Sequence, residues 1–149
     1  MAERFEVRPA AKAIISTEDG LLVLVAGHSR RINLPGGGIK PVGNNIPGES
    51  PLQALYRELK KELGLEDTGL ANVQPAFDYP LIGETTSSDG KAGQAEWHVF
   101  SADLITPFAA LQRPPDSEIT NQYLMTVDKC LASPNVLKLA KRAVRLFFS

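Results

Sequence analysis

The chain has 149 residues, of which 43% are hydrophobic and 22% charged, and its formal net charge is -1. This composition is typical of one globular domain with a buried core. The near-neutral charge excludes a strong general attraction to nucleic acid or to anionic membranes. We find no apolar run long enough to cross a bilayer and no signal-peptide pattern. A single cysteine, Cys130, excludes an intramolecular disulfide, so we expect a cytoplasmic protein.

Strand and turn signals alternate in the first third of the chain. Residues 8–16 and 21–26 are rich in apolar side chains, with an acidic, glycine-containing turn signal between them. This pattern predicts an antiparallel hairpin. A glycine-rich turn follows at residues 35–38, and a polar loop continues to Glu49.

The clearest predicted element is a helix that begins after Ser50 and ends at Gly64. Ser50 is a preferred N-cap residue, Pro51 suits the first helical position, and Gln53 can complete a capping box. Gly64 suits the left-handed position that commonly ends a helix. Four leucines recur at helical spacing and predict a buried stripe: Leu52, Leu55, Leu59 and Leu63.

The second half of the chain contains fewer local signals. Residues 71–79 and 95–102 have strand composition, and we expect the polar segment 85–93 between them to be a loop. Residues 119–127 predict a weaker strand. Residues 134–148 predict a second amphipathic helix, whose basic face we interpret as solvated. Strands and helices that share one core predict an α+β domain.

Two glutamates four residues apart on the first helix are the leading candidates for chemistry. Glu58 and Glu62 share one helix face, with Cβ atoms roughly 6 Å apart, which is close enough to bind one ion. Mg²⁺ prefers oxygen ligands and leaves several positions to water and substrate phosphates. The glycines at 35–38 allow the backbone to approach such an ion or a phosphate. The alternative is that both glutamates are solvated and paired with Arg57 or Lys61.

The arrangement of these residues resembles the signature of the Nudix (MutT-like) hydrolases. That signature has a glycine and a glutamate upstream of Arg-Glu-aliphatic-x-Glu-Glu-x-Gly-aliphatic. Residues 57–65 read Arg-Glu-Leu-Lys-Lys-Glu-Leu-Gly-Leu, and Glu49 stands at the matching distance before them. Residues 34–37, Leu-Pro-Gly-Gly, are similar to the turn that precedes the signature. The resemblance implies a single Nudix-like α+β domain over residues 1–149, with a mixed β-sheet sandwiched between α-helices.

The resemblance also implies a reaction and roles for individual residues. Nudix hydrolases use Mg²⁺, or Mn²⁺, in the attack of water on the pyrophosphate linkage of a nucleoside diphosphate joined to another moiety. Glu58, Glu62 and the carbonyl of Gly37 would bind the metal. Arg57 would orient the glutamates through charge-assisted hydrogen bonds, and Glu49 would support the site from the end of the loop.

The catalytic base is less fixed in this family than the metal ligands. It often comes from a loop after the central strands, where Glu118 is our first choice and Asp116 the second. Glu96, at the start of an expected strand, is a further alternative.

Three residues are candidates for binding the substrate. Arg31 could contact phosphate, Gly38 lies in the glycine turn, and Tyr79 could stack on a base. Pro80 lies fifteen residues after the signature, a spacing found in family members that act on ADP-ribose. It slightly favours ADP-ribose-like or sugar-linked nucleotides over nucleoside triphosphates.

The chain departs from the family pattern in two ways. Lys61 replaces the first glutamate of the Glu-Glu pair, where it can pair with Glu58 and compete with a cation. The loop after Gly37 is longer than in related sequences, and we expect its extra residues to form a flap beside the substrate cleft. Gly43 has the literal spacing before Glu49, but we expect Gly37 to be the structural counterpart.

Three functions remain open on the sequence alone. The leading hypothesis is a magnesium-dependent pyrophosphohydrolase that acts on a small nucleotide. Lys61 motivates the alternative of a nucleotide-binding or regulatory module that has weakened or lost the chemistry. The basic face from Lys138 to Arg145 motivates a third, an RNA-end or protein-interaction domain, although the net charge favours neither nucleic acid nor membrane. Nudix proteins are often dimers, which leaves a homodimer open.

Overall fold

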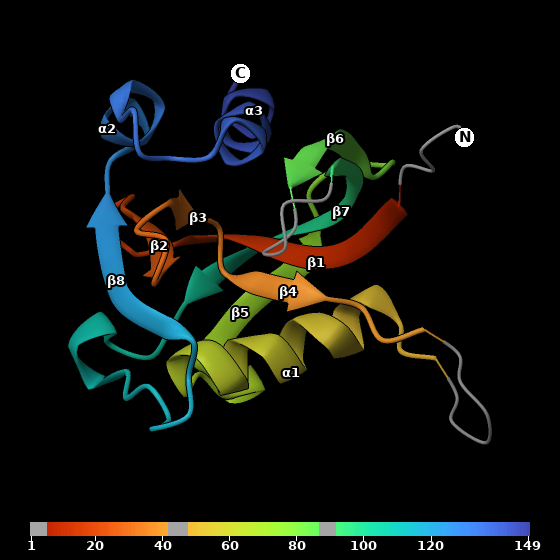
Figure 1. Cartoon of the computed structure of the whole chain (residues 1–149). Coiled ribbons are helices and arrows are strands. Elements are labelled where there is room, and N and C mark those ends of the chain that lie inside the picture. The colour runs from red at the N-terminus through yellow and green to blue at the C-terminus, as the bar shows by residue number, and fades with distance from the viewer. Residues whose placement is uncertain (1–5, 42–47, 87–91) are drawn as a thin grey trace, which may run out of the picture.

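The computed structural model describes residues 6–41, 48–86 and 92–149, which form a mixed sheet between helices (Figure 1). The strands are Glu6–Ser16 (β1), Leu22–Gly27 (β2), Ile32–Asn33 (β3), Gly36–Gly38 (β4), Leu70–Pro75 (β5), Leu81–Thr86 (β6), Ala92–Leu104 (β7) and Ile119–Met125 (β8). The helices are Pro51–Leu63 (α1), Val127–Ala132 (α2) and Lys138–Phe147 (α3), with 3-10 turns at Asp67–Gly69 and Phe108–Ala110. Helix α1 covers one face of the sheet, and α2 and α3 lie on the other (Figure 1). None of the helices in the described ranges has the length and apolar character that a membrane crossing needs.

The sheet is mixed because β1 runs parallel to β7, whereas the other registered pairings are antiparallel. The β1–β7 ladder is long, extending from Glu6↔Gly93 to Ser16↔Asp103. By contrast, β1 and β2 share one registered pair, Ser16↔Leu22. Beyond this pair β2 pairs with β3 and β8, while β4 pairs with β1. The two strands therefore diverge, and the site described below lies between them.

Strand β1 contributes to two separate cores because its side chains alternate between the faces of the sheet. Ala11, Ala13 and Ile15 belong to the core beneath α1. Ile14 belongs to the core beneath α2 and α3. Lys12 lies between these apolar neighbours and is only 8% exposed. A charged group so deeply buried needs partners, and they are supplied by the functional site.

Helix α1 has the predicted ends. The Ser50 hydroxyl accepts a hydrogen bond from the Gln53 amide at 3.1 Å, and the Gln53 side chain accepts one from the Ser50 amide at 2.9 Å. Gly64 is left-handed, with φ 67°, and its amide donates to Lys60 O. Leu52, expected in the buried stripe, is instead exposed. The residues that the helix buries are Ala54, Leu55, Leu59 and Leu63.

Two segments expected to be turn or loop contain strands. The glycine-rich turn includes β4, which pairs with β1 around Ala11↔Gly37. The prediction of a loop at 85–93 was wrong in part, because β6 reaches Thr86 and β7 begins at Ala92. Both pairings rest on backbone hydrogen bonds, which glycine and small polar residues make without displaying a strand-like pattern.

Two expected strands are shorter than predicted. The strand expected at 71–79 ends at Pro75, and the strand expected at 119–127 ends at Met125. In the second case Thr126 accepts a hydrogen bond from the amide three residues later and begins helix α2, which the sequence analysis missed. A six-residue helix is too short to show helical periodicity.

Helix α3 begins later than the expected range of 134–148, at Lys138. Before the helix, residues 134–135 form a turn and Val136 bridges to Ile32 of β3. The amide of Ile32 donates to Asn135 O at 2.9 Å, and the amide of Leu137 donates to Ile32 O at 2.9 Å. This contact joins the C-terminal helices to the edge of the sheet.

Candidate active site

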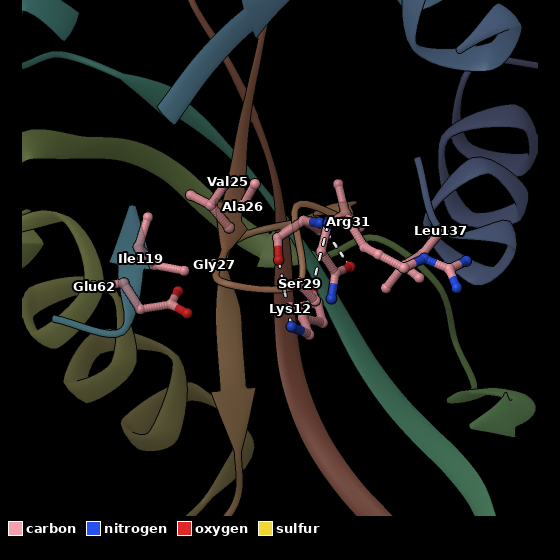
Figure 2. Close-up of a pocket in the computed structure, with 11 residues that line it drawn as sticks. Lys12, Val25, Ala26, Gly27, Ser29, Arg31, Glu62, Ile119 and Leu137 are labelled. Carbon is pink, nitrogen blue, oxygen red and sulfur yellow. Dashed lines mark hydrogen bonds between the residues drawn. The ribbon is translucent and has the colours of Figure 1, made fainter. Parts of the chain in front are cut away.

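A cavity of about 170 Å³ lies where β1 and β2 diverge (Figure 2). Lys12 reaches it from β1, and Glu62 faces it from the last turn of α1. The segment after β2 contributes Ser29, Arg31 and Asn33 to the lining. The cavity therefore combines an apolar strand wall with two side chains of opposite charge, the buried Lys12 and the partly exposed Glu62.

Arg57 connects three parts of the chain beside this cavity. Its Nε and Nη2 donate to the two carboxylate oxygens of Glu49 at 2.7 and 2.8 Å. Its Nη1 donates to Glu58 Oε1 at 2.6 Å, and Nη2 also donates to Gly38 O at 2.8 Å. Bidentate guanidinium–carboxylate pairs fix orientation as well as charge. Arg57 thus holds α1, β4 and the end of the long loop in one arrangement.

Glu49 is fully engaged in this network. Besides Arg57, its Oε1 accepts from the Lys40 amide at 2.8 Å, and its own amide donates to Lys40 O at 3.1 Å. The hydrogen bonds from Arg57, with a further one from the Lys40 backbone, lower the pKa of Glu49 to about 2. Glu49 therefore supports the site and keeps neither oxygen free for a metal. The long loop is joined at its base by the same contacts; Gly43 and most of the expected flap lie outside the described residues.

The Glu49 interaction predicts a pH dependence of stability. A carboxyl group with a depressed folded-state pKa stabilises the fold above its unfolded pKa of about 4.5 and loses that contribution as the pH falls towards 2. We expect Glu49→Gln to lower the free energy of unfolding at pH 7 by about 1–2 kcal/mol. The difference should shrink steadily below pH 4.5 in urea titrations. A difference that is constant with pH would contradict this account.

The two candidate metal ligands lie side by side on α1, and each uses one oxygen within the protein. Glu62 Oε1 accepts from the Gly36 amide at 2.8 Å, and Glu58 Oε1 accepts from Arg57. The second oxygen of Glu58 faces Gly37, where an added Cβ would lie 2.6 Å from it. Burial raises the pKa of Glu62 to about 7, against the opposing effects of Lys12 and the Gly36 amide. Burial therefore disfavours the charged form of this carboxylate unless a positive charge lies beside it.

Lys12 is the functional candidate that the sequence analysis missed. Its ammonium donates to Leu34 O at 3.3 Å and to Gly36 O at 3.2 Å, and it lies 5.3 Å from the centre of the Trp97 ring. Burial lowers its pKa, while the charges of Glu62 and Glu58 oppose that change. The available signal was a lone lysine in the apolar run of residues 10–15, where a strand lysine normally points to solvent.

The donor set fits one hard divalent cation. Glu58 and Glu62 each offer an oxygen, and Gly37, whose carbonyl is the third predicted ligand, lies against the carboxyl end of Glu58. Within the described residues there is no cluster of three or more His, Cys, Asp or Glu side chains that could bind a metal. Mg²⁺ needs no such cluster, because it commonly binds through one or two carboxylates together with substrate phosphates. Lys61 is exposed and lies outside the cavity lining.

The candidates for the catalytic base lie on the segment before β8. Glu118 and Asp116 are both exposed. Between them Ser117 donates its hydroxyl to Glu62 O at 2.9 Å, and Ile119 lines the cavity. Glu118 is thus flanked by two residues that contact the site, although its role as the base stays a prediction. Glu96 lies in β7, paired with β6.

The three candidates for substrate binding do not share one cavity. Arg31 is an exposed residue at the cavity between β1 and β2, and Gly38 contributes its carbonyl to Arg57. Tyr79 is 61% exposed and lines a second cavity of about 210 Å³. There it stacks on Phe77, with ring centres 6.4 Å apart, near His98. The aromatic cavity is a separate candidate for a substrate's non-reacting end.

The geometry of Arg57 predicts that lysine cannot replace it. Lysine retains the positive charge but offers a single nitrogen in place of the fork that reaches Glu49, Glu58 and Gly38 O. We expect Arg57→Lys to reduce metal-dependent turnover by about 10–100-fold. A matched change, Arg113→Lys at an exposed position, should leave turnover within about twofold. Steady-state kinetics measure both, and equal activity of the two variants would refute the positioning role.

Comparison with known proteins agrees with this architecture. Residues 6–146 match the model of the NUDIX domain. Among solved structures, the MutT protein from Methanosarcina mazei Go1 superposes with a TM-score of 0.73 at 18% identity, covering 99% of this chain and 96% of that one. An Ap4A hydrolase from C. elegans, solved as a binary complex, gives a TM-score of 0.68 at 17% identity, with 95% of each chain covered. These likenesses show the fold and confirm the predicted mixed sheet between helices.

One curated relative is closer in sequence over a shorter stretch. The RNA pyrophosphohydrolase of Helicobacter pylori (strain G27) is 34% identical over 76 residues, which cover 49% of this chain and 49% of the relative. The match therefore spans about half the length of that protein. The family match, in contrast, extends over nearly all of the chain, so the protein belongs to the Nudix domain family.

Proposed function

We propose that this protein catalyses metal-dependent hydrolysis of the pyrophosphate linkage in a nucleoside diphosphate joined to another moiety. The observation that carries the proposal is the placement of Glu58 and Glu62. Each carboxylate accepts a hydrogen bond from an N–H group of the protein with one oxygen and keeps the other for a cation, and Glu62 lines the cavity. Membership of the Nudix family supports the same reaction class.

Each residue of the site would have its own role in the reaction. Glu58 and Glu62 would hold Mg²⁺, which when bound offsets phosphate charge and activates the attacked phosphorus. Arg57 orients Glu58, and the Gly36 amide orients Glu62. A water must lose a proton as it attacks phosphorus, and we assign that proton to Glu118 because its neighbours contact the site.

The substrate is proposed at the level of its class. The similar proteins include an Ap4A hydrolase, a UDP-X diphosphatase and an RNA pyrophosphohydrolase, whose names differ in substrate. They therefore favour a reaction class over any single compound. Pro80, next to the aromatic cavity of Phe77 and Tyr79, keeps ADP-ribose-like and sugar-linked nucleotides slightly ahead of nucleoside triphosphates.

A substrate panel tests this proposal. It should include ADP-ribose, a UDP-sugar, diadenosine tetraphosphate, nucleoside triphosphates and 5′-triphosphorylated RNA, each with Mg²⁺, with Mn²⁺ and with EDTA. We expect at least one substrate to be hydrolysed about 100-fold faster with metal than with EDTA. In ¹⁸O-labelled water the label should enter a phosphate product. No metal-dependent turnover on any member would contradict the proposal.

A nucleotide-binding module without turnover is the second candidate, favoured by Lys61 at a position that is glutamate in the family pattern. It predicts ligand binding in calorimetry with no hydrolysis across the same panel.

The 5′ end of RNA is an alternative substrate, because of the relative's name and the basic residues of α3. RNA turnover whose KM rises steeply with salt would favour it. A homodimer, to be tested by light scattering, and a cytoplasmic location are retained as part of the proposal.

A further inference from the structure

The buried ammonium of Lys12 has the contacts of a bound cation. It donates to two backbone carbonyls, lies over the Trp97 ring and interacts electrostatically with Glu62 and Glu58. Gly36 supplies one of these carbonyls, and the amide of the same residue binds Glu62. Lys12 and Glu62 face the same cavity from opposite walls (Figure 2).

We propose that Lys12 is a built-in cation of the active site, which takes the place of one divalent metal ion and occupies the carbonyl of Gly36, next to the predicted metal ligand Gly37. The protein would then use one exchangeable metal ion, held by Glu58 and Glu62, together with this fixed ammonium. The metal and the ammonium would act on the same diphosphate from two sides.

Charge around the site supports this assignment. Arg57 pairs with both Glu49 and Glu58, and Glu62 and Glu58 act electrostatically on Lys12. These three carboxylates and two cationic side chains leave one negative charge, which a single divalent ion already exceeds. A second divalent ion would be placed beside a buried ammonium, at a position where little solvent screens the repulsion. The position that is glutamate in the family pattern is Lys61, so the chain offers no third carboxylate there.

The position of Lys12 in the fold also fits a fixed role. The lysine belongs to β1, whose ladder with β7 extends on both sides of it, so its Cα cannot move freely. Its ammonium is held by two carbonyls of the segment that leads into β4. The side chain is thus fixed at its Cα and at its ammonium. Its charge is already in position when a phosphate enters, so the site needs no reorganisation.

The number of bound metal ions tests the proposal without substrate. Lys12→Met removes the ammonium and keeps a side chain of similar length, and Mn²⁺ can be counted by paramagnetic resonance and calorimetry. We expect the variant to bind a second Mn²⁺, or to bind the first at least about tenfold more tightly than the unchanged protein. The control is Lys60→Met, which removes an exposed lysine one turn before Gly64 and should change Mn²⁺ affinity less than about threefold.

Unchanged or weaker Mn²⁺ binding in a folded Lys12→Met variant would overturn the proposal, as would the absence of Mn²⁺ binding in both proteins. A second measurement uses the unchanged protein, in case the variant fails to fold. In crystals soaked with Mn²⁺, we expect anomalous density at Glu58 and Glu62 with Lys12 still bonded to Gly36 O. Mn²⁺ on that carbonyl, with Lys12 displaced, would overturn the proposal.

The inference rests on the proposed function only for the contact with a diphosphate. Metal counting and turnover are separate readouts, so the two ideas can fail separately. A gain of Mn²⁺ binding in Lys12→Met without hydrolysis of any substrate would support the built-in cation and contradict the proposed hydrolase activity.

Discussion

Replacement of Gly36 by alanine is expected to lower the free energy of unfolding by about 3–5 kcal/mol. Gly36 has φ 127°, a conformation that an alanine adopts only with strain. Its added Cβ would overlap the carbonyl oxygen of Ala11 and lie 2.9 Å from the Cα of Lys12. Both contacts are backbone atoms of β1, which the ladder to β7 holds in place. The strain therefore cannot be relieved by turning a side chain.

The neighbouring glycines give this prediction matched controls. An added Cβ at Gly38 meets nothing within 4 Å, so Gly38→Ala should change stability by less than about 0.5 kcal/mol. At Gly37 the Cβ meets the flexible carboxyl end of Glu58, so Gly37→Ala should disturb activity more than stability. Urea denaturation of the three variants measures the differences. Equal stability of the Gly36 and Gly38 variants would show that the close approach of β4 to β1 is not required.

Replacement of Glu62 by glutamine is expected to reduce metal-dependent turnover at least about 100-fold while the protein remains folded. The amide oxygen of glutamine can still accept the hydrogen bond from the Gly36 amide. What disappears is the charge that would hold a cation and that faces Lys12. The effect should therefore appear in kcat and in Mn²⁺ affinity together.

Glu66→Gln is the matched control for this substitution. Glu66 is exposed just beyond the same helix and makes a 3.6 Å ion pair with the exposed Lys60. Such surface pairs contribute little, so turnover should stay within about twofold of the unchanged protein. Full activity of Glu62→Gln would show that the reaction does not need this carboxylate and would contradict the proposed metal site.

The sequence predicts the parts of the fold that local chemistry decides. Helix α1 was located to the residue because its cap, its buried leucines and Gly64 all act within a few positions of one another. The positions of Glu58 and Glu62 follow from that helix, since four residues bring two side chains to one face. Local patterns therefore gave the two carboxylates and the arginine beside them.

Other features depend on contacts between distant segments and left little trace in the sequence. Strand β4 exists because a glycine run can lie against β1, which the composition of the run does not reveal. The role of Lys12 arises only once β2 diverges from β1 and Glu62 is brought opposite. Helix α3 starts late because Ile32, far away in sequence, pairs with the residues before it.

Because Lys40 and Glu49 are hydrogen-bonded to each other, the geometry of the site does not depend on the length of the segment between them. The Glu49 side chain accepts a hydrogen bond from the Lys40 amide, and the Glu49 amide donates one to the Lys40 carbonyl, so the two ends of the segment lie side by side. The entropy of closing such a segment changes slowly with its length. Insertions or deletions between these two residues should therefore leave Arg57 in place. This makes the segment a natural position for evolutionary variation, and for grafting a recognition peptide beside an unchanged reaction centre.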